Sequence, residues 1–214
     1  MIKPILFNTE MVRAILDGQK TCTRRIVKGA IPDDAMWGYT MFTPKGCISC
    51  RGMYADEYCE KFFRLPYQQG DILYVRETWG TYARNWWEAD YFMYRADYPI
   101  DATTYTHPGG IICDLPKWRA SLHMPKEAAR IWLRVTDARV ERLQEMTQED
   151  AEMEGATESV DSITKFRTSA LLNFAKIWDS AIKKSDLDYY GWVANPWVWV
   201  FEFERCEKPK EAEK

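Results

Sequence analysis

The alternation of apolar and polar residues predicts several short strands. The segments that alternate are residues 72–79, 91–95, 130–140 and 197–203. On the first of these, one face carries Leu73, Val75, Glu77 and Trp79. The last segment is rich in rings, since Trp197, Trp199, Phe201 and Phe203 occupy every second position.

Helical spacing of apolar residues predicts three helices, one before these strands and two between the third and the fourth. The first covers residues 9–17, with Asn8 or Thr9 as its cap and Gly18 after its end. The second opens at Thr147, whose spacing to Asp150 fits an acidic capping box, and stops near Gly155. The third is expected over residues 162–183.

This order of elements favours an α+β fold with a mixed or antiparallel sheet. Strands this short and this aromatic suit a small, partly closed barrel flanked by helices. Residues 30–65 and 98–117 have no clear period and are expected to be two loop insertions. We expect a single domain over residues 1–205, followed by a disordered charged tail at 206–214.

Composition narrows the function classes. The 214 residues are 46% apolar and carry a net charge of −3, so a core is available but no overall basic field indicates a nucleic-acid binder. The start lacks a secretion signal and no apolar run is long enough to cross a membrane, so we expect a cytoplasmic protein without membrane contact. Ten Trp, twelve Tyr and nine Phe are more rings than this core needs. They either fill the barrel or stack on a planar ligand.

A local basic cluster follows the first helix. It consists of Lys20, Arg24, Arg25 and Lys28, with no acidic residue between them. Cations favour a helix C-terminus, which accounts for one or two of these charges. Alternatively, the arginines contact phosphate.

Two further positions carry candidate chemistry. Lys20 lies three residues before Thr23, and a desolvated lysine among other cations can act as the base that activates a hydroxyl. Glu77 shares its strand face with apolar residues, where a carboxylate is costly to bury alone. Either that face opens into a polar pocket, or Glu77 pairs with an arginine such as Arg25. The acidic residues 150–154 are most simply a solvated helix face, with Asp150 capping.

No metal or cofactor is expected. Cys47, Cys50 and Cys59, joined by Cys113 or His107, would give four zinc ligands, but the second Cys-x-x-Cys pair typical of such sites is missing. The chain also lacks a P-loop and a Gly-x-Gly-x-x-Gly motif. Six cysteines without a secretion signal are most simply reduced thiols.

The order of the motifs resembles the ASCH domain family of PUA-like β-barrels, and most closely its longer members in bacteriophages and prophages. The segments that carry the resemblance are Lys3-Pro4-Ile5-Leu6-Phe7, Gly18-x-Lys20-Thr21-x-Thr23-Arg24-Arg25, Gly70-Asp71-x-Leu73-x-Val75-Arg76-Glu77-Thr78-Trp79, His123-Met124-Pro125, Val140-Glu141-Arg142-Leu143-Gln144, Asp150-Ala151-x-x-Glu154-Gly155 and Asn195-Pro196-Trp197-Val198-Trp199. They span residues 3–203 and leave both insertions outside. Thr23 stands where the commoner family motif has an acidic residue.

The resemblance implies a cleft for RNA or a modified base. One small group in that family hydrolyses N4-acetylcytidine with a lysine, a threonine and a glutamate. Matching its motifs carries these roles to Lys20, Thr23 and Glu154. In that reading Arg24 and Arg25 hold a phosphate or an oxyanion, and Trp79 stacks on the base.

The sequence therefore favours recognition of RNA or a modified nucleoside, and leaves open whether the protein is also an amide hydrolase acting on an N4-acylated cytidine. The rival is a non-catalytic RNA-binding module of phage or prophage origin. A phage structural protein fits least well, because no coiled coil or repeat is visible.

Overall fold

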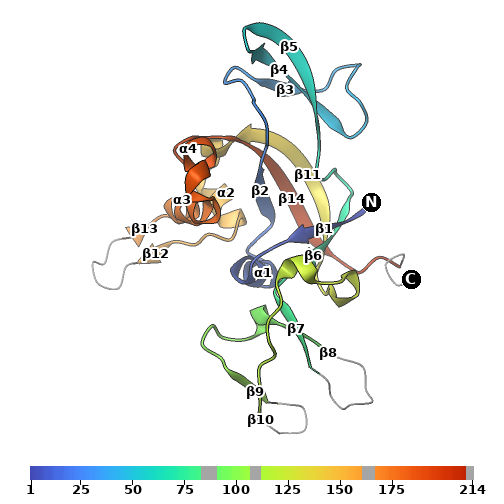
Figure 1. Ribbon diagram of the computed structural model, residues 1–214, viewed down its shortest axis with the longest axis vertical. Coiled ribbons are helices and arrows are strands. Elements are labelled where there is room, and N and C mark those ends of the chain that lie inside the picture. The colour runs from blue at the N-terminus through green and yellow to red at the C-terminus, as the bar shows by residue number, and fades with distance from the viewer. Residues whose placement is uncertain (83–90, 107–111, 161–166, 211–214) are drawn as a thin grey trace. The chain divides into compact units, whose positions relative to one another are not determined.

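The computed structural model describes residues 1–82, 91–106, 112–160 and 167–210. The chain forms two compact units: unit 1 contains residues 1–18, 72–134 and 205–214, and unit 2 contains residues 19–71 and 135–204. Strands predominate over helices in a mixed α+β structure, which confirms the predicted class (Figure 1). The single domain over residues 1–205 stays a prediction.

Unit 1 is built around β6, which runs parallel to β1 and antiparallel to the start of β11. Its elements are β1 (Ile2–Leu6), α1 (Thr9–Leu16), β6 (Ile72–Arg76), β7 (Trp79–Tyr82), β8 (Tyr91–Tyr94), β9 (Thr104–Thr106), β10 (Ile112–Asp114), the first residues of β11 (Trp132–Arg142), and short 3-10 helices at Arg95–Asp97, Ser121–His123 and Lys126–Ala128. β7 pairs with β8, and β9 pairs with β10.

Unit 2 is built around β14, which pairs antiparallel with β2. Its elements are β2 (Cys22–Ile26), β3 (Met36–Gly38), β4 (Cys47–Tyr54), β5 (Glu57–Arg64), most of β11, α2 (Gln148–Met153), β12 (Ser159–Val160), β13 (Arg167–Thr168), α3 (Ala170–Ala181), α4 (Leu187–Tyr190), most of β14 (Trp197–Cys206), and 3-10 helices at Leu143–Glu145 and Lys184–Asp186. β3, β4 and β5 form a separate three-stranded antiparallel sheet.

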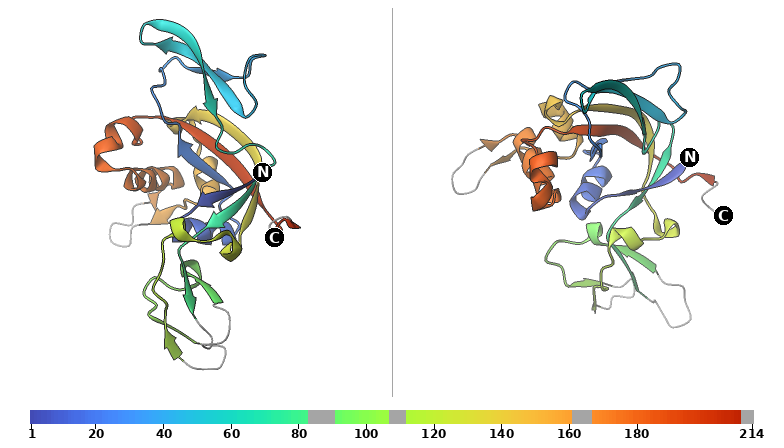
Figure 2. Two further views of the ribbon diagram at one scale, coloured as in Figure 1. Left: turned by 45° about the vertical axis from the view of Figure 1, so that its right-hand side comes forward. Right: turned by 45° about the horizontal axis from the view of Figure 1, so that its top comes forward.

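The two faces of β14 separate the core of unit 2 into two clusters. Val198 and Val200 pack with residues of α2 and α3, such as Ala151 and Phe174, and these helices lie together beside the strand (Figure 2). Trp199 and Phe201, on the other face, pack with apolar residues of the segments around β2, β4 and β5. This split follows from the period of two in a strand. In unit 1, the core gathers around Trp79, Met124 and Trp132.

Most predicted elements are confirmed, with displaced ends. Asn8 caps α1 by accepting a hydrogen bond from Met11 N, and Thr147 opens α2 with the capping box to Asp150. The third helix begins at Ala170 instead of residue 162, because Ser169 caps it and residues 167–168 are a strand. Residues 161–166 lie outside the described part of the chain.

The two insertions are not loops without order, and here the prediction was wrong. Residues 30–65 contain the sheet of β3, β4 and β5, and residues 98–117 contain the pair of β9 and β10, although 107–111 are not described. The β4–β5 turn at Ala55 and Asp56 has φ values of 47° and 70°, a conformation that usually requires glycine or asparagine, so the usual turn signal is missing. The tail is an extension of β14 as far as Cys206, and residues 211–214 are not described.

Candidate functional site

Lys20 and Glu154 form a buried ion pair in unit 2. Lys20 Nζ donates a hydrogen bond to the backbone oxygen of Glu154 at 2.9 Å and a closer one to its carboxylate oxygen Oε2. The two side chains are 0% and 4% exposed. A bond from Thr21 N to the Met153 carbonyl, 2.8 Å long, holds the chain before β2 against the end of α2. Residues 134 positions apart are thereby joined.

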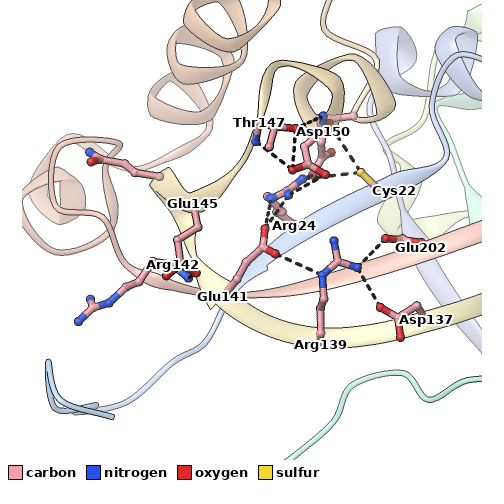
Figure 3. A network of polar contacts seen from close by, with 12 residues as sticks. Cys22, Arg24, Asp137, Arg139, Glu141, Arg142, Glu145, Thr147, Asp150 and Glu202 are labelled. Carbon is pink, nitrogen blue, oxygen red and sulfur yellow. Dashed lines mark hydrogen bonds and ion pairs between the residues drawn. The ribbon is translucent and has the colours of Figure 1, made fainter. Parts of the chain in front are cut away.

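Arg24, on β2, is the centre of the carboxylate network beside this pair (Figure 3). Its Nε and Nη2 donate to Glu141 Oε1 at 3.0 and 2.6 Å. Asp150 and Glu154 each place an oxygen 3.6 Å from its guanidinium nitrogens. Burial lowers the pKa of Arg24, but Glu141 and Glu154 outweigh it, and the net change is upward. The Arg24 side chain is 0% exposed, so in this conformation its guanidinium is engaged by carboxylates and does not reach a phosphate in solvent.

Asp150 and Cys22 complete this network. Asp150 Oδ2 accepts from Thr147 N at 2.9 Å, and although burial raises the pKa of Asp150, this bond and Arg24 bring it below its usual value. The Cys22 thiol points at the Asp150 carbonyl, 3.9 Å away. Its pKa is raised to about 12, first by burial and then by the charge of Glu154. The predicted capping role of Asp150 is confirmed, but Glu154 lies in the interior and not on a solvated face.

A second group of ion pairs extends along β11 and β14. Arg139 donates to Asp137 at 2.9 Å and to Glu141 at 3.3 Å, and it also contacts Glu202. Glu141 therefore lies between Arg24 and Arg139 and links the buried network to a half-exposed one (Figure 3).

Thr23 is buried, with 2% of its surface exposed, and faces Phe201 across the β2–β14 ladder. Because side chains alternate along a strand, Thr23 lies on the face opposite Cys22 and Arg24. The structure thus brings Lys20 and Glu154 together and places Thr23 on the other side of β2. Its predicted role as nucleophile stays a prediction.

Arg25 shares the Thr23 face and lies opposite Trp199 in the ladder. Burial lowers the pKa of Arg25, against the opposing effects of Glu154 and Tyr67. Half-buried in unit 2, Arg25 is the member of the predicted arginine pair that keeps some contact with solvent.

Glu77, in unit 1, pairs with an arginine, as one of the two sequence-based alternatives predicted. The partner is Arg130 and not Arg25, the example named from the sequence. Arg130 grips both carboxylate oxygens, at 2.9 and 3.0 Å, and also donates to Asp97 at 2.8 Å. The guanidinium lies 3.9 Å from the ring centre of Tyr94. Burial raises the pKa of Glu77 despite Arg130. Glu77 is 1% exposed and the Arg130 side chain 26%, so the carboxylate is internal while the guanidinium reaches solvent.

Trp79 is also internal to unit 1. It is 4% exposed, packs edge-on to Phe92, and has the Arg119 guanidinium 5.0 Å from its ring centre. Its indole nitrogen has no hydrogen-bond partner within the described residues. Because only 4% of its surface is exposed, this conformation does not present Trp79 for stacking on a base.

A cleft in unit 2 is lined by chain neighbours of Lys20 and Glu154, and not by these two residues themselves. It has a volume of about 450 Å³ and is lined by Gln19, Glu149, Glu152, Met153, Ala156, Thr157 and Glu158. Three glutamates make this lining acidic. Such a wall repels phosphate and tolerates an uncharged ligand.

The residues that sequence reasoning left without a role are Glu141, Arg130 and Asp97. Glu141 lies in the Val140–Gln144 motif, so the sequence could have singled it out as a candidate residue. A single sequence does not indicate that Arg24 is its partner. Among the described residues no group of His, Cys, Asp or Glu is arranged to hold a metal ion, and His107 lies outside them. No described helix is both long and apolar enough to span a membrane.

The chain was compared with protein-family models, curated proteins and solved structures. No protein-family model matches the chain, and neither the curated proteins nor the solved structures give a match.

Proposed function

We propose that this protein binds a modified nucleoside and hydrolyses the amide of an N4-acylated cytidine, with Lys20 and Glu154 as its proton-transfer pair. The observation that carries the proposal is their buried contact, because a lysine and a glutamate from distant segments meet where the ASCH resemblance puts a catalytic lysine and glutamate. A PUA-like barrel as the surrounding fold belongs to the same proposal.

The chemistry follows from the hydrogen bond between the two groups. The hydrogen bond between Lys20 Nζ and Glu154 Oε2 is a direct path along which a proton can pass between the two groups during the reaction. Once a proton has passed to Glu154, Lys20 can accept one from a hydroxyl and Glu154 can donate one to a leaving group. Glu154 Oε1 has no hydrogen-bond partner in the described part of the chain, although Arg24 lies 3.6 Å away.

In the hydrolysis, Lys20 takes the proton of the Thr23 hydroxyl, whose oxygen attacks the acyl carbonyl. Glu154 donates a proton to the leaving exocyclic amine, which releases cytidine. Water then cleaves the acyl–threonine ester and yields the carboxylic acid. Since Thr23 lies on the opposite face of β2, this sequence requires the β2 segment to shift when substrate binds.

The acidic cleft favours a nucleoside over RNA as the substrate. Glu149, Glu152 and Glu158 would oppose a phosphate next to the ligand, so N4-acetylcytidine should be a better substrate than its 5′-monophosphate.

The test is the release of cytidine from N4-acetylcytidine, followed by mass spectrometry. Glu154→Gln and Thr23→Ala should each abolish nearly all turnover, and the double variant should lose little more, because the residues act as a unit. Glu127→Gln makes the same chemical change at an exposed position that does not line the cleft; it is the matched control and should keep full activity. Turnover that survives Thr23→Ala would remove the nucleophile from the proposal, and absence of turnover in the wild type would reject hydrolysis.

The second candidate is a non-catalytic RNA-binding module. It is favoured by the closed state of the network, since Lys20 and Arg24 are fully buried and already paired. In that case RNA affinity should fall steeply with salt, and Arg25→Glu should weaken binding and flatten the salt dependence.

A further inference from the structure

The sheet of β3, β4 and β5 carries large apolar side chains on both faces, and on one of them charged residues, Arg51, Glu60 and Arg64, stand between them. One face contributes Trp37, Ile48 and Phe63 to the core around Trp199 and Phe201. The other face carries Met36, Met53, Tyr58 and Phe62, which are between 42% and 55% exposed. Register places Met53 directly opposite Tyr58, and Phe62 lies two positions beyond Glu60 on the same face. An antiparallel sheet usually turns a polar face to water, and four large apolar side chains exposed on one face indicate an interaction surface.

The outer edge of this sheet is β5, which pairs only with β4 among the described residues. The two-residue turn at Ala55 and Asp56 makes Tyr54 and Glu57 the closing hydrogen-bonded pair. Hydrogen-bonded and non-hydrogen-bonded pairs alternate along an antiparallel ladder. The backbone groups of the residues at 58, 60, 62 and 64 therefore point away from β4, and an edge of this kind is a template for another strand.

The side chains on this edge are self-complementary. Glu60, Phe62 and Arg64 follow one another on the exposed face of β5. When a second copy of β5 pairs antiparallel with Phe62 opposite Phe62, Glu60 of each copy lies opposite Arg64 of the other. Ser49 and Thr40 occupy only Oε1 of Glu60, and within the described residues Oε2 has no hydrogen-bond partner, so it can accept from an arginine.

We propose that the partner of this surface is a second copy of the chain, joined through β5 to β5 into a continuous six-stranded sheet. This arrangement places one Phe62–Phe62 pair between two Glu60–Arg64 pairs. Aromatic pairs and pairs of opposite charge across neighbouring strands both stabilise a sheet. Nucleic acid is the weaker alternative, because Glu60 lies in the middle of the ring-bearing face and Asp56 and Glu57 stand at its tip.

The test is sedimentation velocity of the full chain over a range of concentrations. The wild type should dimerise reversibly. Glu60→Arg and Arg64→Glu each create two like-charge pairs and should each weaken the dimer at least about tenfold. An equimolar mixture of the two variants should dimerise again, because one copy then carries arginine at both positions and the other carries glutamate at both, so each cross-strand pair joins opposite charges.

Lys61→Glu is the matched control for Arg64→Glu. It makes the same change of charge on the same strand but on the opposite face of the sheet, and it should leave the dimer intact. Phe62→Lys, which replaces an exposed ring, supplies a second weakening variant if Glu60→Arg does not fold. A wild type that stays monomeric overturns the proposal. A dimer that neither charge variant weakens also overturns it, and so do folded charge variants whose mixture stays monomeric. If the wild type is a monomer and binds single-stranded RNA, and Phe62→Lys abolishes that binding, the face belongs to a nucleic-acid site.

Discussion

Replacing Glu154 with glutamine should lower the free energy of unfolding by about 3 kcal/mol. The Lys20 side chain is 0% exposed, so it cannot turn to water when its carboxylate partner is neutralised. The variant therefore keeps a buried cation whose charge is no longer compensated. Glutamine has nearly the same shape as glutamate, so packing around α2 should be unchanged.

The magnitude follows from the contacts that remain. Breaking a buried ion pair by removing one partner costs about 3–5 kcal/mol. The lower end applies here because Lys20 keeps its 2.9 Å bond to the backbone oxygen at position 154, and the glutamine oxygen can still accept a hydrogen bond. Arg24 loses a carboxylate at 3.6 Å but keeps both bonds to Glu141.

Urea unfolding followed by tryptophan fluorescence measures this loss. Glu152→Gln makes the same chemical change at an exposed position of α2 and should stay within about 0.5 kcal/mol of the wild type. If Glu154→Gln costs no more than an exposed ion pair, about 0–1 kcal/mol, the pair is solvated in solution and the reasoning from burial is wrong.

Two further predictions concern the same network. Asp150→Asn should cost about 1 kcal/mol at neutral pH through loss of the capping box. Because the pKa of Asp150 is lowered in the folded state, its contribution is present above the ordinary aspartate value of about 3.9 and is lost as the pH falls through the folded value, so unfolding curves of variant and wild type should converge in acid. Cys22, with a pKa raised to about 12, should resist alkylation in the native protein and react once it is unfolded, which peptide mass spectrometry shows directly; native labelling of Cys22 as fast as that of a free thiol would contradict the burial of the network.

Local sequence signals were sufficient where neighbours along the chain decide the structure. The alternation of Leu73, Val75 and Glu77 predicted one buried face of β6 and its continuation, and all three are at most 1% exposed. The Thr147–Asp150 spacing predicted the start of α2, because a capping box involves only groups within one helical turn. The prediction placed the start of α3 too early, because the helical spacing of apolar residues extends N-terminal to the actual cap at Ser169.

The candidate site depends on contacts that no local pattern contains. The sequence by itself determined that Glu77 needs either a polar pocket or a cationic partner, because the cost of burying a charge is a property of the residue, and it showed that Lys20 lies in a basic cluster. Only the tertiary structure decided that Arg130 serves Glu77, that Glu141 and Asp150 occupy Arg24, and that Lys20 meets Glu154. Partner choice of this kind rests on which strands and helices become neighbours, and residues far apart along the chain have no shared period from which it can be read.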